Sequence, residues 1–213
     1  MKKEELPKII PIFPLSNFII FPKTTVPLNI FEPRYIDMIN ESMKSKKLIG
    51  MIQPLNFNNV DKLQPNLHQV GCLGKITSFK ETEDGRYLIE LRGLIRFEIL
   101  NEIKTNKLYR EFKVDYKMFE DDLSITSCET KTDNLMDKAK VFFKRSGLLL
   151  NWKEFEKLSQ NQKINTLAMI APITNEEKQK ILETVTLKEK IGILNEIIIF
   201  YLHEISFNNQ TIQ

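Results

Sequence analysis

The sequence predicts an α+β protein, with a small β-barrel over residues 1–120 and an α-helical bundle over residues 121–213. Apolar and polar residues alternate through most of residues 70–116, which is typical of half-buried strands. After about Thr126 the apolar residues recur at a period near 3.6, as expected for amphipathic helices. The change of period, next to the acidic run at 120–122, sets the predicted domain boundary.

Prolines divide the N-terminal segment into short apolar pieces, at Pro14, Pro22, Pro27 and Pro33. Proline lacks an amide hydrogen and restricts the residue before it, so a long helix cannot run through this segment. We expect strands at residues 10–15 and 24–30. A helix should begin at Pro33 and end near Lys47, because proline fits the first helical position.

Further strands are predicted at residues 48–52, 70–79, 87–91, 95–99 and 112–116. In the later strands apolar residues alternate with charged ones, which places Phe97 on an apolar face and Arg96 on the opposite face. Asp84-Gly85 and Arg92-Gly93 separate these strands. Consecutive short strands with such breaks favour a small closed or half-closed barrel.

About five helices are predicted after the boundary, the first ending at Gly147 and two being separated by Pro172. Four polar caps each have Glu or Gln three residues later: Asn151 with Glu154, Ser159 with Gln162, Thr174 with Glu177, and Thr186 with Glu189. Each cap stabilises a helix start by about 1 kcal/mol. The apolar stretch 191–202 is assigned to a buried helix, with a weak self-association face as the alternative.

Several separated segments carry a family resemblance. They read IFPL from Ile12, IIFP from Ile19, VPLNIFEPRY from Val26, VGCLGKI from Val70 and GLIRFEIL from Gly93. In this order they resemble the N-terminal, substrate-binding domain of the ATP-dependent Lon proteases. The later segments LAMIAPIT and EKQKILE resemble the short stand-alone bacterial proteins that carry this domain without the ATPase and protease modules.

The resemblance implies that the β-rich part is a barrel of the PUA (pseudouridine synthase and archaeosine transglycosylase) type. It also implies a non-catalytic module that binds unfolded or extended polypeptides, as a recognition or adaptor protein in protein quality control. A protease or another quality-control protein is a further implied partner. RNA binding through the PUA-like barrel is the alternative function.

The sequence contains no recognisable catalytic or cofactor motif. Gly74-Lys75 is not a phosphate loop, because Ile76 follows where Ser or Thr is required. Cys72 and Cys128 are far apart and match no metal or redox spacing. We therefore expect a protein that is not an enzyme and that needs no cofactor or metal.

The charge balance does not favour a nucleic-acid or membrane partner. The chain has 31 basic and 28 acidic residues, a net charge of +3, and its lysines are dispersed along the sequence. No signal peptide is predicted, since Glu4, Glu5 and Pro7 interrupt the start of the chain. The stretch 191–202 is too short to span a bilayer. A cytoplasmic location is expected.

A peptide-binding groove is predicted from the residues Phe18, Ile20, Phe21, Pro22, Arg34 and Tyr35. The run 18–21 is too apolar to be wholly solvated, yet it is bracketed like a loop, so part of it should form an exposed patch. Arg34 and Tyr35 are residue types common in binding hot spots. Two alternatives are that the whole run is buried against the helical half, and that Arg34 pairs with Glu32.

Overall fold

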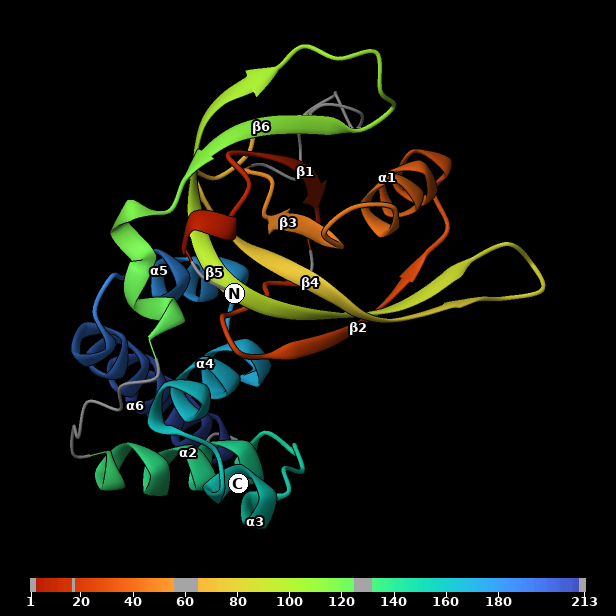
Figure 1. Cartoon of the computed structure of the whole chain (residues 1–213). Coiled ribbons are helices and arrows are strands. Elements are labelled where there is room, and N and C mark those ends of the chain that lie inside the picture. The colour runs from red at the N-terminus through yellow and green to blue at the C-terminus, as the bar shows by residue number, and fades with distance from the viewer. Residues whose placement is uncertain (1–2, 17, 56–64, 125–131, 211–213) are drawn as a thin grey trace. The chain divides into compact units, whose positions relative to one another are not determined.

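The computed structural model describes residues 3–16, 18–55, 65–124 and 132–210, so Cys128 lies outside the described residues. The chain folds as two units, Met1–Ile125 and Thr126–Gln213 (Figure 1). The predicted boundary at residue 120 falls inside a 3₁₀ helix, η2 (Lys117–Leu123), that belongs to the first unit.

In its described residues the first unit consists mainly of strands. The elements are η1 (Lys3–Glu5), β1 (Ile9–Pro14), β2 (Thr25–Ile30), α1 (Pro33–Met43), β3 (Leu48–Ile52), β4 (Val70–Glu81), β5 (Tyr87–Ile103), β6 (Arg110–Asp115) and η2. The helix α1 begins at Pro33 as predicted but ends at Met43, earlier than expected. The chain turns after it, and Lys47 has a positive φ of 59°.

Strand pairing closes five strands into a barrel. The sheet order is β2-β5-β4-β3-β1-β6, and β6 pairs with β5 as well as with β1. β1 and β3 run parallel, whereas the other pairs are antiparallel. β2 pairs with the first part of β5 and is not part of the ring. The predicted α+β fold, a small barrel followed by helices, is confirmed.

The barrel core follows the predicted alternation. Phe97 is fully buried in one cluster with Ile12, Leu73 and Phe112. A Cβ atom on Gly71 would lie 2.6 Å from the Phe97 ring, so this position needs glycine to admit the ring. The apolar faces of the strands therefore meet inside the barrel.

β5 is a single strand of 17 residues, although a break was expected at Gly93. Gly93 takes its place in the inward-facing series, and the pairing with β4 shifts register there. A Cβ atom on Gly93 would overlap the carbonyl oxygen of Phe21. Glycine is needed for this close approach of another chain segment, and it does not end the strand.

Arg96 is buried, with 2% of its surface exposed, although its strand position predicted solvent. Its guanidinium makes two hydrogen bonds of 2.9 Å to the Asp122 carboxylate, and its backbone N–H donates to the same carboxylate at 3.0 Å. The guanidinium also lies 4.3 Å from the centre of the Phe119 ring. These contacts hold η2 against β5 within the first unit.

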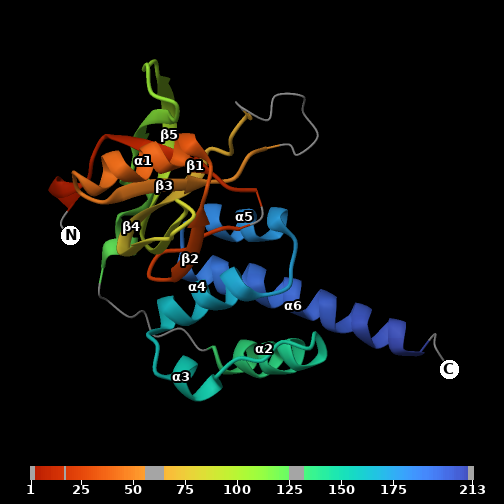
Figure 2. The ribbon, with the colours of Figure 1, turned by 90° about the vertical axis from the view of Figure 1, so that its right-hand side faces the viewer.

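In its described residues the second unit contains five helices, as predicted: α2 (Asp133–Arg145), α3 (Trp152–Glu156), α4 (Gln160–Ile170), α5 (Asn175–Glu183) and α6 (Leu187–Gln210). α6 packs against α2, α4 and α5, as Figure 2 shows. In α6 the side chains of Leu194 and Ile198 are fully buried, which confirms a core helix, while Phe200 is 55% exposed.

The predicted helix ends are confirmed by hydrogen bonds. Asn151, Ser159, Thr174 and Thr186 each accept a bond from the backbone N–H three residues later. At the end of α2, Gly147 has a φ of 71°. The Gly147 and Leu148 N–H groups donate to carbonyl groups of the last turn, a Schellman motif that glycine favours.

Candidate functional site

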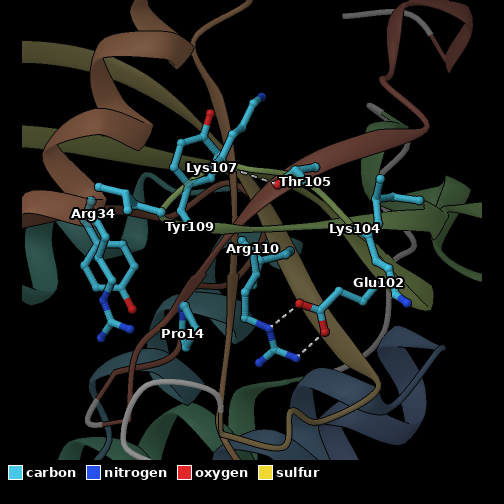
Figure 3. Close-up of a pocket in the computed structure, with 12 residues that line it drawn as sticks. Pro14, Arg34, Glu102, Lys104, Thr105, Lys107, Tyr109 and Arg110 are labelled. Atoms are coloured by element: carbon cyan, nitrogen blue, oxygen red, sulfur yellow. Dashed lines mark hydrogen bonds and ion pairs between the residues drawn. The ribbon is translucent and has the colours of Figure 1, made fainter.

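A pocket of about 560 Å³ lies on the first unit, where the connection between β5 and β6 meets the end of β1 and the start of α1 (Figure 3). We call it the hairpin pocket. Its lining includes Pro14 of β1, Arg34 and Tyr35 of α1, and much of residues 102–110. The side chains that line it are mostly polar or charged, so its chemistry is that of hydrogen bonding and charge.

Arg34 is placed by the first turn of α1, which begins at Pro33. Its guanidinium makes an ion pair with Glu32 at 2.8 Å and lies 4.6 Å from the centre of the Tyr35 ring. The expected alternative that Arg34 pairs with Glu32 is therefore observed. The Arg34 side chain remains 24% exposed, so part of its charge faces the pocket.

Tyr35 forms the apolar floor of the pocket. Its ring packs edge-on against Phe13 with ring centres 4.5 Å apart, and the residue is 6% exposed. Burial raises the pKa of the Tyr35 hydroxyl, while the Arg34 charge acts in the opposite direction. The hydroxyl therefore stays protonated at neutral pH and can donate a hydrogen bond.

Arg110 and Glu102 face each other across the β5–β6 pair. The Arg110 guanidinium donates two hydrogen bonds to the Glu102 carboxylate, at 2.8 and 2.7 Å, and a third to the Pro65 carbonyl at 2.7 Å (Figure 3). Hydrogen bonding to Arg110 lowers the pKa of Glu102. This bidentate pair fixes the base of the hairpin that forms one wall of the pocket.

The tip of the hairpin adds two lysines and a tyrosine. Lys107 makes an ion pair with Glu111 at 2.8 Å and lies 5.2 Å from the centre of the Tyr109 ring. The hydrogen bond with Glu111 raises the pKa of Lys107. Within the described residues, the exposed Lys104 side chain has no hydrogen-bond or ion-pair partner. Four cations thus converge on one pocket, from the start of α1 and from the β5–β6 hairpin: Arg34, Lys104, Lys107 and Arg110.

The family model of the ATP-dependent protease La (Lon) substrate-binding domain matches residues 9–199 of this chain. The chain belongs to the Lon substrate-binding domain family. The resemblance that the N-terminal motifs carried is thereby confirmed, and the match also includes most of the helical unit.

Relatives of this Lon domain are full Lon proteases. The chain is 31% identical to the Lon protease of Flavobacterium johnsoniae over 51% of this chain and 13% of that protein. It is 28% identical to the Lon protease of Syntrophus aciditrophicus over 94% of this chain and 26% of that protein. The chain therefore spans about a quarter or less of the length of these relatives.

Two solved structures share the fold of this Lon domain. One is a Lon N-terminal domain protein from Xanthomonas campestris, with a TM-score of 0.62 and 18% identity over 87% of this chain and 96% of that one. The other is the N-terminal domain of the Mycobacterium avium complex Lon protease, with a TM-score of 0.60 and 17% identity over 90% of this chain and 98% of that one.

The predicted site residues of this Lon domain fall into two groups. Arg34 and Tyr35 line the hairpin pocket, whereas Phe18, Ile20, Phe21 and Pro22 do not. Ile20 and Phe21 are 1% and 0% exposed, so they provide no exposed patch. The Phe21 carbonyl and amide are both bonded to the Thr24 hydroxyl, at 2.7 and 3.3 Å, which holds the run in a tight turn.

The hairpin residues were missed because their pattern in the sequence is that of ordinary solvated charge. Between 102 and 111 the chain has three basic and two acidic residues, besides a tyrosine. Only the pairing of β5 with β6, and of β6 with β1, brings these residues opposite the start of α1. The sequence signal that could have indicated these residues is the high density of charged side chains around Tyr109.

The part of the chain that the structure describes bears on two further kinds of feature, a metal site and a membrane span. Its His, Cys, Asp and Glu residues form no group of three that is able to hold a metal ion. Cys72 is buried in β4, where its thiol donates to the Leu73 carbonyl at 3.7 Å and packs as a small core residue. Among the described helices, none combines the length and apolar character needed to cross a membrane.

Proposed function

We propose that this Lon substrate-binding domain is a non-catalytic module that binds extended or unfolded polypeptide, with a client segment seated in the hairpin pocket. The observation that carries the proposal is the convergence of Arg34, Lys104, Lys107 and Arg110 on one open pocket with Tyr35 in its floor. An extended peptide offers a carbonyl oxygen at every residue, and these cations are donors without an acceptor function.

The size of the pocket supports a peptide as occupant. A volume of about 560 Å³ lies within the usual range for small-ligand sites and suits a few residues of an extended chain. The partial pairing of Arg34 with Glu32 and of Arg110 with Glu102 holds the donors in place before binding. Such preorganisation reduces the entropy lost when the client binds.

The biological role that we propose is recognition or adaptor work in protein quality control, in concert with a protease. The family description names a substrate-binding domain, and the sequence contains neither a phosphate loop nor a protease motif. The purified 213-residue chain should therefore neither hydrolyse ATP nor degrade casein. An ATPase or protease activity that co-purifies with this chain, and that is lost when the chain is removed, would contradict the non-catalytic role.

Fluorescence anisotropy with a labelled, extended peptide of no net charge tests the site. Combining Arg34→Ala with Lys104→Glu should weaken binding by roughly tenfold, since each exposed charged contact is worth about 0.2–1 kcal/mol. The matched control is Lys80→Glu, an exposed lysine of β4 that does not line the pocket. Unchanged affinity in the double variant, with an intact circular dichroism spectrum, would remove the hairpin pocket as the binding site.

A further inference from the structure

A second hollow on the first unit, of about 1000 Å³, is surrounded by basic side chains. We call it the basic hollow. Its lining includes Lys23, Lys46, Lys47, Lys75 and Arg92, against the two carboxylates of Glu5 and Asp122. Asp122 is held by the buried Arg96, so it does not neutralise the lysines. We propose that the basic hollow binds acidic segments of polypeptides, at a site separate from the hairpin pocket.

Lys23 occupies a backbone position that normally requires glycine. The Thr24 N–H donates to the Phe21 carbonyl at 3.2 Å, with Pro22 and Lys23 as the central residues of the turn. Lys23 has a φ of 65°. Proline followed by a residue of positive φ defines a type II turn, in which glycine is strongly favoured at the second central position. Lysine at this position runs against the local conformational preference, and its ammonium group donates a hydrogen bond to the Ser124 carbonyl at 2.8 Å.

Lys47 occupies a second position of this kind, after the end of α1. Its φ is 59°, and its N–H donates to the Ser42 carbonyl at 3.0 Å. Left-handed residues that follow a helix are usually glycine. Within the described residues, Lys23 and Lys47 are the non-glycine residues with positive φ, and both line the basic hollow.

Lys75 and Arg92 form a third arrangement that is locally unfavourable. They are directly opposite each other in the pairing of β4 with β5. Like charges in this position destabilise a sheet. Both side chains are exposed, and neither has an ion-pair partner in the part of the chain that the structure describes. Three departures from local stability thus converge on one surface, the pattern that is typical of residues serving a binding site.

The lining favours an acidic polypeptide over a nucleic acid. None of the described residues that line the hollow is aromatic, whereas single-stranded nucleic acids are bound by stacking their bases on aromatic rings. The half-buried Leu94 and Leu123 contribute apolar wall between the cations. Carboxylates interspersed with aliphatic side chains match this combination of charge and apolar surface.

The binding test uses a short fluorescein-labelled peptide rich in glutamate and leucine, and its counterpart with glutamine in place of glutamate. The full chain should bind the acidic peptide at low ionic strength, and its affinity should fall as salt is added. It should bind the glutamine peptide at least tenfold more weakly. Combining Lys75→Gln with Arg92→Gln should weaken binding of the acidic peptide roughly three- to tenfold. Lys80→Gln, outside the hollow, should leave it unchanged.

The variant Lys47→Gly separates a binding role from a structural one. Glycine relieves the positive φ, so the melting temperature should rise by about 1–4 °C while acidic-peptide binding weakens two- to fivefold. A fall in the melting temperature, or unchanged binding in both Lys47→Gly and the double variant, would overturn the proposal. Binding of single-stranded RNA or polyphosphate without binding of the acidic peptide would overturn it as well. The hairpin-pocket variants Arg34→Ala and Lys104→Glu should not change the affinity for the acidic peptide. The proposals for the two sites can therefore be refuted independently.

Discussion

Phe97 is expected to contribute strongly to the stability of the barrel. Its ring is fully buried, and Gly71 and Gly50 lie against it, so that neighbouring side chains cannot easily fill the space it leaves. The variant Phe97→Ala should lower the free energy of unfolding by about 3–5 kcal/mol. Denaturant unfolding measures this loss. Phe79→Ala, at a position 38% exposed, is the control. A loss below about 1 kcal/mol at Phe97 would contradict the assigned strand facing.

Glu102 should titrate below its ordinary range because Arg110 hydrogen-bonds its charged form. The pKa is lower in the folded chain than in the unfolded chain, so the pair stabilises the fold above the unfolded pKa. That contribution is lost as the pH falls through the folded pKa. An NMR titration of the Glu102 carboxyl measures the midpoint. Arg110→Gln should raise it, and an unchanged midpoint would contradict the pairing.

The burial of a single residue was predictable from the sequence where it depends only on the alternation of side chains along its strand. Phe97 follows the period of two, and its burial is observed. Arg96 follows the same period but lies buried, because its partner Asp122 is 26 residues away in a separate element. An alternation pattern cannot reveal that an ion pair compensates a buried charge, since that requires the tertiary position of the partner.

The start of α5 depends on a capping box that is both predicted and observed. The Thr174 hydroxyl accepts a hydrogen bond from the Glu177 N–H at 3.2 Å, and the Thr174 N–H donates to the Glu177 carboxylate at 2.8 Å. The variant Thr174→Ala should destabilise the protein by about 1 kcal/mol, whereas Thr174→Gly should cost only a few tenths. Thermal unfolding measures the difference. Equal losses in the two variants would contradict the capping role.

Elements were predictable when their signals are local. Helix caps and the change of period depend on residues a few positions apart, and both are found in the structure. The continuity of β5 through Gly93 was not predictable, since the glycine serves the approach of Phe21 rather than a turn. Of the residues that line the hairpin pocket, Arg34 and Tyr35 carry a local signal in the sequence, whereas the opposite wall depends on long-range strand pairing.

At the scale of the whole molecule, the fold class followed from two periodicities, whereas the predicted domain boundary rests on composition. The acidic run at residues 120–122 marks a change of composition and for that reason predicts a break. The structure uses Asp122 inside the first unit, where it neutralises Arg96. A polar run between two periodic segments can therefore be a linker, or it can be a structural element that belongs to one of the two flanking domains.

Two fragments test this boundary and the coupling of the units. Residues 1–125 keep Asp122, whereas residues 1–120 lose it and leave Arg96 buried without its carboxylate. Removing one partner of a buried ion pair costs about 3–5 kcal/mol, so the shorter fragment should be less stable by about that amount. The intact chain should unfold in one cooperative transition and be more stable than either fragment. Calorimetry and denaturant unfolding measure both quantities. Equal stability of the two fragments would contradict the role of Asp122, and two well-separated transitions in the intact chain would contradict the coupling of the units.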